Sequence, residues 1–131
     1  MTEKKVIWIT GASSGIGKSL AIKFANENWI VAASARRENL LQELNEINKN
    51  IHPFPLDVTD IEQCKMVFKD IIKKFKDVEI SVFSTGIHDP KSEKEFNLEK
   101  IREIMEVNYF GTMNSINSVY DYFNNKKNGQ I

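Results

Sequence analysis

Strand-like and helix-like hydrophobic patterns alternate along this chain, and the alternation limits the folds open to it. Short runs of β-branched and apolar residues are each followed by a segment in which apolar residues recur at helical spacing. Such alternation predicts βαβ units, in which helices cover both faces of a parallel sheet. The expected strands are 6–10, 29–33, 51–56 and 80–83, with a helix after each, the last running from Leu98 to Phe123.

The helical spacing also predicts which side chains face the core. In the first helix these are Ile16, Leu20 and Phe24, at intervals of four residues. The sequence Thr59-Asp60-Ile61-Glu62 has the form of a capping box and should open the third helix. The inward positions expected in the third helix are Ile61, Cys64, Phe68, Ile71, Ile72 and Phe75, and those in the last are Ile101, Ile104, Met105, Phe110, Met113, Ile116 and Val119.

Length and composition narrow the function classes. The 131 residues suit one domain, and 18 Lys and Arg residues balance 18 Asp and Glu residues, so no overall field attracts nucleic acid or an anionic membrane. The apolar runs are too short to cross a bilayer, and the N-terminus does not have the pattern of a secretory signal. The single cysteine, Cys64, excludes an internal disulfide and a cysteine-cluster metal site. We therefore expect a cytoplasmic protein without metal, membrane or nucleic-acid partners.

A glycine-rich loop, Thr-Gly-Ala-Ser-Ser-Gly-Ile-Gly at 10–17, lies between the first strand and the first helix. Glycine permits the tight turn, lets backbone N–H groups approach an anion, and lets the helix pack closely on the strand. The N-terminus of the helix then faces that anion. The loop predicts a dinucleotide site that includes Gly11, Ser13, Ser14, Gly15, Ile16 and Gly17.

The same loop is one residue away from a P-loop, in which Ala12 would replace the first glycine. Lys18 would then reach the β- and γ-phosphates of a nucleoside triphosphate, and Ser19 would bind Mg²⁺. This interpretation gives no role to Gly11 or Gly15, and no later strand ends in an obvious magnesium-binding Asp. A P-loop NTPase or kinase is the alternative to the dinucleotide site.

The pattern Thr10-Gly11-x-x-x-Gly15-x-Gly17 resembles the cofactor loop of the short-chain dehydrogenase/reductase family, and the resemblance covers the whole chain. It implies a single Rossmann-type domain over 1–131: a doubly wound parallel α/β sheet of strand order 3-2-1-4, incomplete because the chain ends before a fifth strand. It also implies a nicotinamide dinucleotide at the carboxyl ends of the strands and a reaction that interconverts an alcohol and a carbonyl.

Arg36 and Arg37 follow the second strand, where members of the family that prefer NAD carry an Asp. A guanidinium group can hold a 2′-phosphate by two charge-assisted hydrogen bonds, whereas a carboxylate would repel it. The resemblance therefore implies that NADP(H) is favoured over NAD(H). Two solvated arginines at the start of a helix are the alternative.

Asp57 and Val58, after the third strand, resemble the pair that contacts adenine in the family, although Asp57 could simply precede the next helix. Ser84, Thr85 and Gly86 end the fourth strand, where the family usually has Asn-Asn-Ala-Gly and this chain has Phe-Ser-Thr-Gly. Both asparagines are replaced, and the Ser84 hydroxyl could supply part of their hydrogen bonding. The resemblance assigns all five residues to the cofactor site.

Asn108 and Gly111 lie inside the last predicted helix, where both residue types are unfavourable. Together they predict a close helix contact or a kink. The resemblance makes Asn108 the asparagine of the family's catalytic tetrad, whose backbone holds a proton-relay water. The alternative is a tolerated polar residue on a packed helix.

The family's Ser and Tyr-x-x-x-Lys, which orient the substrate and transfer the proton, follow a fifth strand. Residues 128–131 resemble the start of that strand, so we expect this chain to lack them and the fourth strand to be an unpaired edge. Tyr122 and Lys126 have the same spacing but precede the fifth strand, and we interpret them as ordinary residues of a helix end.

The sequence thus predicts the N-terminal part of an NADP(H)-dependent short-chain oxidoreductase acting on a small-molecule substrate. This chain alone should bind cofactor at most. A non-catalytic dinucleotide-binding remnant is the other interpretation. Since the family commonly pairs its long helix across a dimer interface, a homo-oligomer through Leu98 to Phe123 is also expected, with apolar side chains exposed on that helix where its usual cover is absent.

Overall fold

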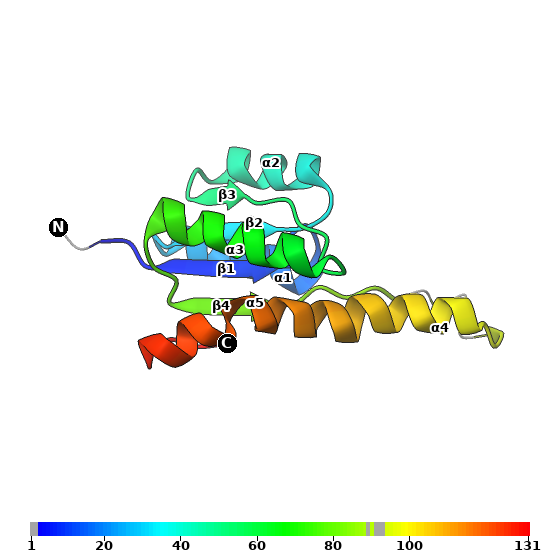
Figure 1. Ribbon diagram of the computed structural model, residues 1–131. Coiled ribbons are helices and arrows are strands. Elements are labelled where there is room, and N and C mark those ends of the chain that lie inside the picture. Colours follow the sequence, from blue (N-terminus) through cyan, green and yellow to red (C-terminus); the bar gives the residue numbers. More distant parts are fainter. Residues whose placement is uncertain (1–2, 89, 91–93) are drawn as a thin grey trace.

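A four-stranded parallel sheet with helices on both faces forms the body of the protein (Figure 1). This computed structural model describes residues 3–88, 90 and 94–131. The strand order is β3-β2-β1-β4, which confirms the predicted Rossmann-type α/β fold. The strands are β1 Val6–Thr10, β2 Ile30–Ser34, β3 Ile51–Pro53 and β4 Ile80–Phe83, so the second begins one residue later and the third is shorter than expected.

Both faces of the sheet are buried, which explains why the strands are apolar almost without interruption. Along β1, Val6 and Trp8 belong to the core on one face, whereas Ile7 and Ile9 belong to the core on the other. The first core is closed by α3 Ile61–Phe75 and α5 Gly111–Lys126, and the second by α1 Gly15–Asn26 and α2 Glu38–Ile47 (Figure 1).

The first helix packs on the sheet through its smallest residues rather than through the predicted stripe. Ile16 is 77% exposed, and Leu20 and Phe24 are only partly buried. A Cβ on Gly17 would lie 2.2 Å from the carbonyl oxygen of Gly11, so the helix begins closer to the loop than any larger residue would permit. The buried positions lie one residue further along: Gly17, Ala21 and Ala25.

The third helix begins after an aspartate, so the predicted capping box is wrong. Asp60 accepts hydrogen bonds from two backbone N–H groups of the first helical turn, each at 3.1 Å. Thr59 instead donates to Asp57 Oδ1, from its N–H at 3.0 Å and its hydroxyl at 2.7 Å. Of the predicted inward residues, Cys64, Phe68 and Ile71 are buried, Ile72 and Phe75 half-buried, and Ile61 exposed.

The predicted helix from Leu98 to Phe123 is interrupted where Asn108 and Gly111 suggested a kink. It consists of α4 Leu98–Met105, a π-helical turn η2 Glu106–Phe110, and α5. A Cβ on Gly111 would lie 2.6 Å from Val58 Cγ2, which confirms the predicted close contact.

Most of the predicted apolar stripe on this helical run faces outward. The expectation that Ile101, Met105, Phe110 and Met113 face the core is wrong, since all four are exposed. Their exposure agrees with the expected apolar surface on this run. The buried residues of α5 are Gly111, Ser115, Val119 and Phe123.

The free edge of β4 is partly paired. Ser81 N–H donates to the Gln130 carbonyl at 2.9 Å, and Gln130 N–H donates to the Glu79 carbonyl at 3.0 Å. The prediction of an unpaired edge is therefore wrong at this end, where Gln130 forms an isolated parallel bridge with Ile80. Among the helices that the structure describes, none is long and apolar enough to span a membrane.

Candidate dinucleotide site at the carboxyl ends of the strands

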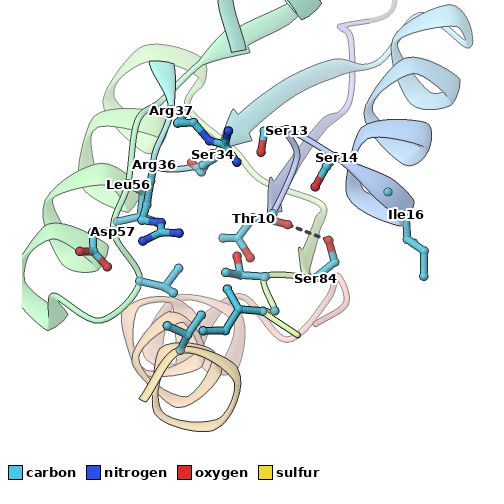
Figure 2. A pocket seen from close by; sticks show the side chains of 18 residues that line it. Thr10, Ser13, Ser14, Ile16, Ser34, Arg36, Arg37, Leu56, Asp57 and Ser84 are labelled. Atoms are coloured by element: carbon cyan, nitrogen blue, oxygen red, sulfur yellow. Dashed lines mark hydrogen bonds between the residues drawn. The ribbon is translucent and has the colours of Figure 1, made fainter. Parts of the chain in front are cut away.

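A hollow of about 330 Å³ lies where the strands end and the following loops diverge (Figure 2). This is the edge at which parallel α/β sheets bind ligands. Every residue predicted to bind cofactor lines the hollow except Gly17, which is buried beneath the glycine loop. The sequence therefore identified most of the lining. The lining residues that were not among those predicted to bind cofactor are Thr10, Ser34, Ala35, Leu56, Ile87 and Val107.

Two glycines of the loop adopt positive φ for different reasons. A Cβ on Gly11 (φ +69°) would lie 2.7 Å from the backbone of Ser84, so this glycine lets the loop contact the end of β4. Gly15 (φ +56°) has no atom within 4 Å of the position of its missing Cβ. Gly15 therefore keeps space open beside the N-terminus of α1.

The first turn of α1 has polar groups to offer a ligand. Ser14, its N-cap, forms no side-chain capping hydrogen bond, and no acidic residue lies in the turn. The N–H groups of a first turn have no partner within the helix, and they carry the positive end of its dipole. Together with the open space at Gly15, this arrangement fits a pyrophosphate. Lys18 and Ser19, which a P-loop would require, do not line the hollow.

Two cations border the hollow beyond β2. The exposed side chains of Arg36 and Arg37 are directed into it, Arg36 on the side of Asp57 and Arg37 on the side of Ser13 (Figure 2). Neither arginine forms an ion pair or hydrogen bond within the described part of the chain. Ala35, which precedes them, carries no carboxylate that could pair with them. The pair fits an anion such as a phosphate.

The wall after β3 is formed by Asp57 and Val58. Asp57 Oδ1 is taken by Thr59, and Oδ2 accepts no hydrogen bond from any described residue, so it can accept one from a ligand N–H. The Asp57 N–H donates to Gln63 Oε1 at 3.0 Å. Val58 is 5% exposed and presents apolar surface beside this acceptor.

Ser84 connects the ends of two neighbouring strands. Its hydroxyl donates to the Thr10 carbonyl at 2.8 Å, joining the ends of β4 and β1 (Figure 2). Thr10 Oγ1 is buried at the hollow without a hydrogen-bond partner among the described residues. Phe83 packs edge-on against Trp8, with ring centroids 5.5 Å apart, so the position of the first asparagine belongs to the core in this protein.

Asn108 lies behind the lining rather than in it. Its side chain accepts from Ile87 N–H at 2.7 Å and donates to the Ile87 carbonyl at 2.9 Å, which fixes the loop after Gly86. Its own carbonyl accepts from the Thr112 hydroxyl at 2.8 Å. The side chain of Asn108 thus positions one wall of the hollow.

Several lining residues escaped the sequence analysis because nothing in their local pattern marks them. Ser34 looks like an ordinary strand residue, yet its hydroxyl accepts from Trp8 Nε1 at 2.9 Å in the core. Leu56 and Val107 are apolar residues that reach the hollow only through the tertiary fold. Ile87 could have been found, because it immediately follows the predicted Gly86.

Tyr122 and Lys126 lie at the amino end of the sheet, beside the residues that lead into β4. Tyr122 donates to the carboxylate of Asp77, and Lys126 Nζ donates to the same oxygen at 2.6 Å and to the Val78 carbonyl at 2.9 Å. Burial and the Asp77 hydrogen bond raise the pKa of Tyr122. A tyrosine that must release a proton needs the opposite shift.

The remaining nucleophilic and titratable groups do not form a second site in the part of the chain that the structure describes. Burial raises the pKa of Cys64 to about 11, so it stays a protonated, packed thiol. Burial, followed by the charges of Lys74 and Lys4, lowers the pKa of His52. No cluster of His, Cys, Asp and Glu among the described residues could hold a metal ion.

Comparison with known proteins agrees with this geometry. The profile of the short chain dehydrogenase family matches residues 5–131. The chain is 31% identical to dehydrogenase/reductase SDR family member 7 of Mus musculus, covering 96% of this chain and 40% of that protein. It is 32% identical to 3-oxoacyl-[acyl-carrier-protein] reductase FabG of Thermotoga maritima, covering 98% of this chain and 54% of that protein.

Solved structures show the same relationship. ElxO with NADP bound superposes with a TM-score of 0.87 and 26% identity over 96% of this chain and 53% of that one. The chain thus spans about half the length of these relatives. Its sequence, fold and glycine loop agree, and the chain belongs to the short-chain dehydrogenase/reductase family.

Proposed function

We propose that this chain is the dinucleotide-binding part of an oxidoreductase and that it favours NADP(H) over NAD(H). The observation that carries the proposal is the pair Arg36 and Arg37, directed into the hollow without a carboxylate partner in the described chain. A 2′-phosphate supplies the anion that these guanidinium groups lack. The related ElxO structure contains bound NADP, which is consistent with this choice.

The other parts of the hollow suit the rest of such a cofactor. The open first turn of α1 and the space at Gly15 would hold the pyrophosphate. Asp57 Oδ2 would accept a hydrogen bond from the adenine amine, and Val58 would pack on the ring. When bound, the cofactor supplies the hydride that is exchanged with the substrate. The role of this chain is to bind and orient it.

The proposed reaction of the whole protein interconverts an alcohol and a carbonyl of a small molecule. It is supported by membership of the family and by the names of the relatives, dehydrogenases and reductases. For these 131 residues alone we propose cofactor binding without turnover, because Tyr122 and Lys126 are held by Asp77 away from the hollow. The alternative function, dinucleotide binding without catalysis, also predicts cofactor binding without turnover for these 131 residues.

Two further parts of the proposal concern context. The exposed Ile101, Met105, Phe110 and Met113 on the α4–α5 run support a homo-oligomer formed through this face. The single, buried Cys64 is consistent with a reducing cytoplasm.

Calorimetric titration with NADPH, NADH and Mg²⁺-ATP tests the proposal. We expect NADPH to bind at least about tenfold more tightly than NADH, a difference of about 1.4 kcal/mol. Equal affinities would contradict the NADP(H) preference. Absence of dinucleotide binding together with Mg²⁺-dependent ATP binding would replace the proposal by the P-loop alternative.

A further inference from the structure

Among the strands that the structure describes, none forms backbone hydrogen bonds with the wall made by Asp57 and Val58. Helices supply the partners instead. Gln63 of α3 accepts from the Asp57 N–H at 3.0 Å. Asn114 of α5 donates from Nδ2 to the Val58 carbonyl at 2.9 Å, across a separation of 56 residues. The wall is therefore fixed by side chains of α3 and α5 rather than by strand pairing.

A second contact with α5, at Gly111, also holds Val58 in place. Because Gly111 has no Cβ, α5 leaves room for Val58 Cγ2. A Cβ at position 111 would lie only 2.6 Å from that atom. Val58 is thus confined between α5 on one side and the hollow on the other. The only other hydrogen-bond donor to its carbonyl in the described chain is the Cys64 thiol, at 3.7 Å and intrinsically weak.

We propose that Asn114 is a positioning residue for the adenine half of the dinucleotide, an inference that rests on the proposed function. Asn114 does not line the hollow and would not touch the ligand. It would act through Val58, by holding the carbonyl and so the apolar side chain at a fixed distance from Asp57. Removing its N–H leaves a buried carbonyl poorly satisfied, which favours movement of this wall.

The effect should be confined to one half of the ligand. The opposite wall, after β4, is fixed independently, because Asn108 forms both of its side-chain hydrogen bonds with Ile87. Loss of the Asn114 bond leaves those two bonds unchanged. Binding of a ligand without adenine should therefore survive.

The test compares Asn114→Leu with the wild-type protein, and Asn117→Leu is the matched control. Asn117 is exposed on the same helix and forms no hydrogen bond through its side chain with the described residues. Affinities are measured for NADPH, for adenosine 2′,5′-bisphosphate, and for nicotinamide mononucleotide by ligand-observed NMR. The decisive quantity is the ratio of the two half-ligand affinities, because partial unfolding lowers both affinities by the same factor.

For Asn114→Leu we expect adenosine 2′,5′-bisphosphate and NADPH to bind at least about fivefold more weakly. Nicotinamide mononucleotide binding and both half-ligand affinities of Asn117→Leu should change by less than about twofold. Gly111→Ala should shift the ratio in the same direction, because its Cβ would displace Val58 from its contact with α5. This second variant provides the test if Asn114→Leu does not fold.

An unchanged ratio in a folded Asn114→Leu or Gly111→Ala variant would overturn the role of Asn114. An equal loss for both half-ligands leaves the ratio unchanged and counts as this contradicting result, since it describes a purely structural residue. If the wild-type protein binds none of the three ligands, the proposed function itself fails, and the inference fails with it.

Discussion

The two ends of the sheet contain similar polar residues but use them differently. At the carboxyl end, the first N–H groups of α1, the two arginines and Asp57 Oδ2 have no hydrogen-bond partners in the described chain. At the amino end, Asp77, Tyr122 and Lys126 are bound to one another, and Lys126 also holds the Val78 carbonyl. One end has polar groups left for a ligand, whereas the other has used them to join α5 to the start of β4.

The comparison shows why a residue pattern alone can mislead. Tyr122 and Lys126 have the Tyr-x-x-x-Lys spacing of the family's catalytic pair, but the fold places them at the opposite end of the sheet from the loops that line the hollow. The available hydrogen-bonding capacity at a concave site, rather than the spacing, indicates where a ligand binds.

Gly15→Val should have the largest effect on binding. The valine side chain would occupy the open space beside the first turn of α1, and its positive φ would be strained. We expect NADPH affinity to fall at least about 100-fold, or about 2.7 kcal/mol, by calorimetry. Gly11→Ala is the contrasting variant: its Cβ would meet the Ser84 backbone at 2.7 Å, so it should lower the unfolding temperature. Wild-type affinity in Gly15→Val would remove the glycine loop from the site.

Arg36→Ala should weaken NADPH binding selectively. Because its guanidinium group is directed into the hollow and has no partner in the described chain, we expect a loss of about tenfold, or about 1.4 kcal/mol, for NADPH and little for NADH. The measurement is calorimetric titration with both cofactors. Arg102→Ala, an exposed arginine on α4, is the control and should leave both affinities unchanged. An equal loss for NADPH and NADH would show that Arg36 does not read the 2′-phosphate.

At the other end, Tyr122→Phe should affect stability and not binding. It removes the hydrogen bonds to Asp77 and to the Val78 N–H, which should lower the free energy of unfolding by about 1 kcal/mol in urea titration. Tyr120→Phe, exposed on the same helix, should be neutral. A loss of NADPH affinity in Tyr122→Phe without a loss of stability would contradict the division between the two ends.

The same cluster predicts how stability depends on pH. Burial acts to raise the pKa of Asp77, but hydrogen bonds from Lys126 and Tyr122 outweigh it and hold the pKa below its usual value. A depressed carboxyl pKa contributes stability that is lost as the pH falls below about 4. The pKa values of Tyr122 and Lys126 are raised, so their contribution is lost as the pH rises above about 10.

Unfolding in urea across this pH range checks the assignment. Asp77→Asn should be less stable than wild type at neutral pH, and the difference should shrink toward acid, where wild-type Asp77 becomes protonated. A difference that stays constant below about pH 4 would show that the Asp77 charge does not contribute.

Lys18→Ala should have the smallest effect. Lys18 is exposed on α1 and does not line the hollow, so NADPH affinity should change by less than about twofold by calorimetry. Loss of a Mg²⁺-dependent ATP affinity in this variant would instead support the P-loop alternative.

The sheet order followed from the resemblance to the family, whereas the alternation of strands and helices and most of the lining of the hollow could be predicted from the residues themselves. Strand periods, the glycine loop and the residues at strand ends carry that information locally, because parallel strands bring their carboxyl ends to one edge. The helix faces were less predictable. Periodicity selects the largest apolar residues, but α1 and α5 approach their neighbours through Gly17 and Gly111, where close packing requires the smallest ones.

Apart from Asn108, the supports behind the hollow could not be predicted. Asn114, Gln63 and Trp8 look like ordinary helix and strand residues, and each acquires its partner only through the tertiary fold. The correct cap of α3 also depends on geometry, since Thr59 and Asp60 are both good N-caps, and Thr59 is engaged by Asp57.

The most direct test of the central claim is an amide ¹H–¹⁵N correlation spectrum recorded while NADP⁺ is added. We predict that the signals that shift belong to the glycine loop, to Arg36 and Arg37, and to the Asp57–Val58 wall, while those of Asp77, Tyr122 and Lys126 stay in place. Shifts centred on Tyr122 and Lys126, or none at millimolar NADP⁺, would contradict the claim that the carboxyl end of the sheet is the dinucleotide site.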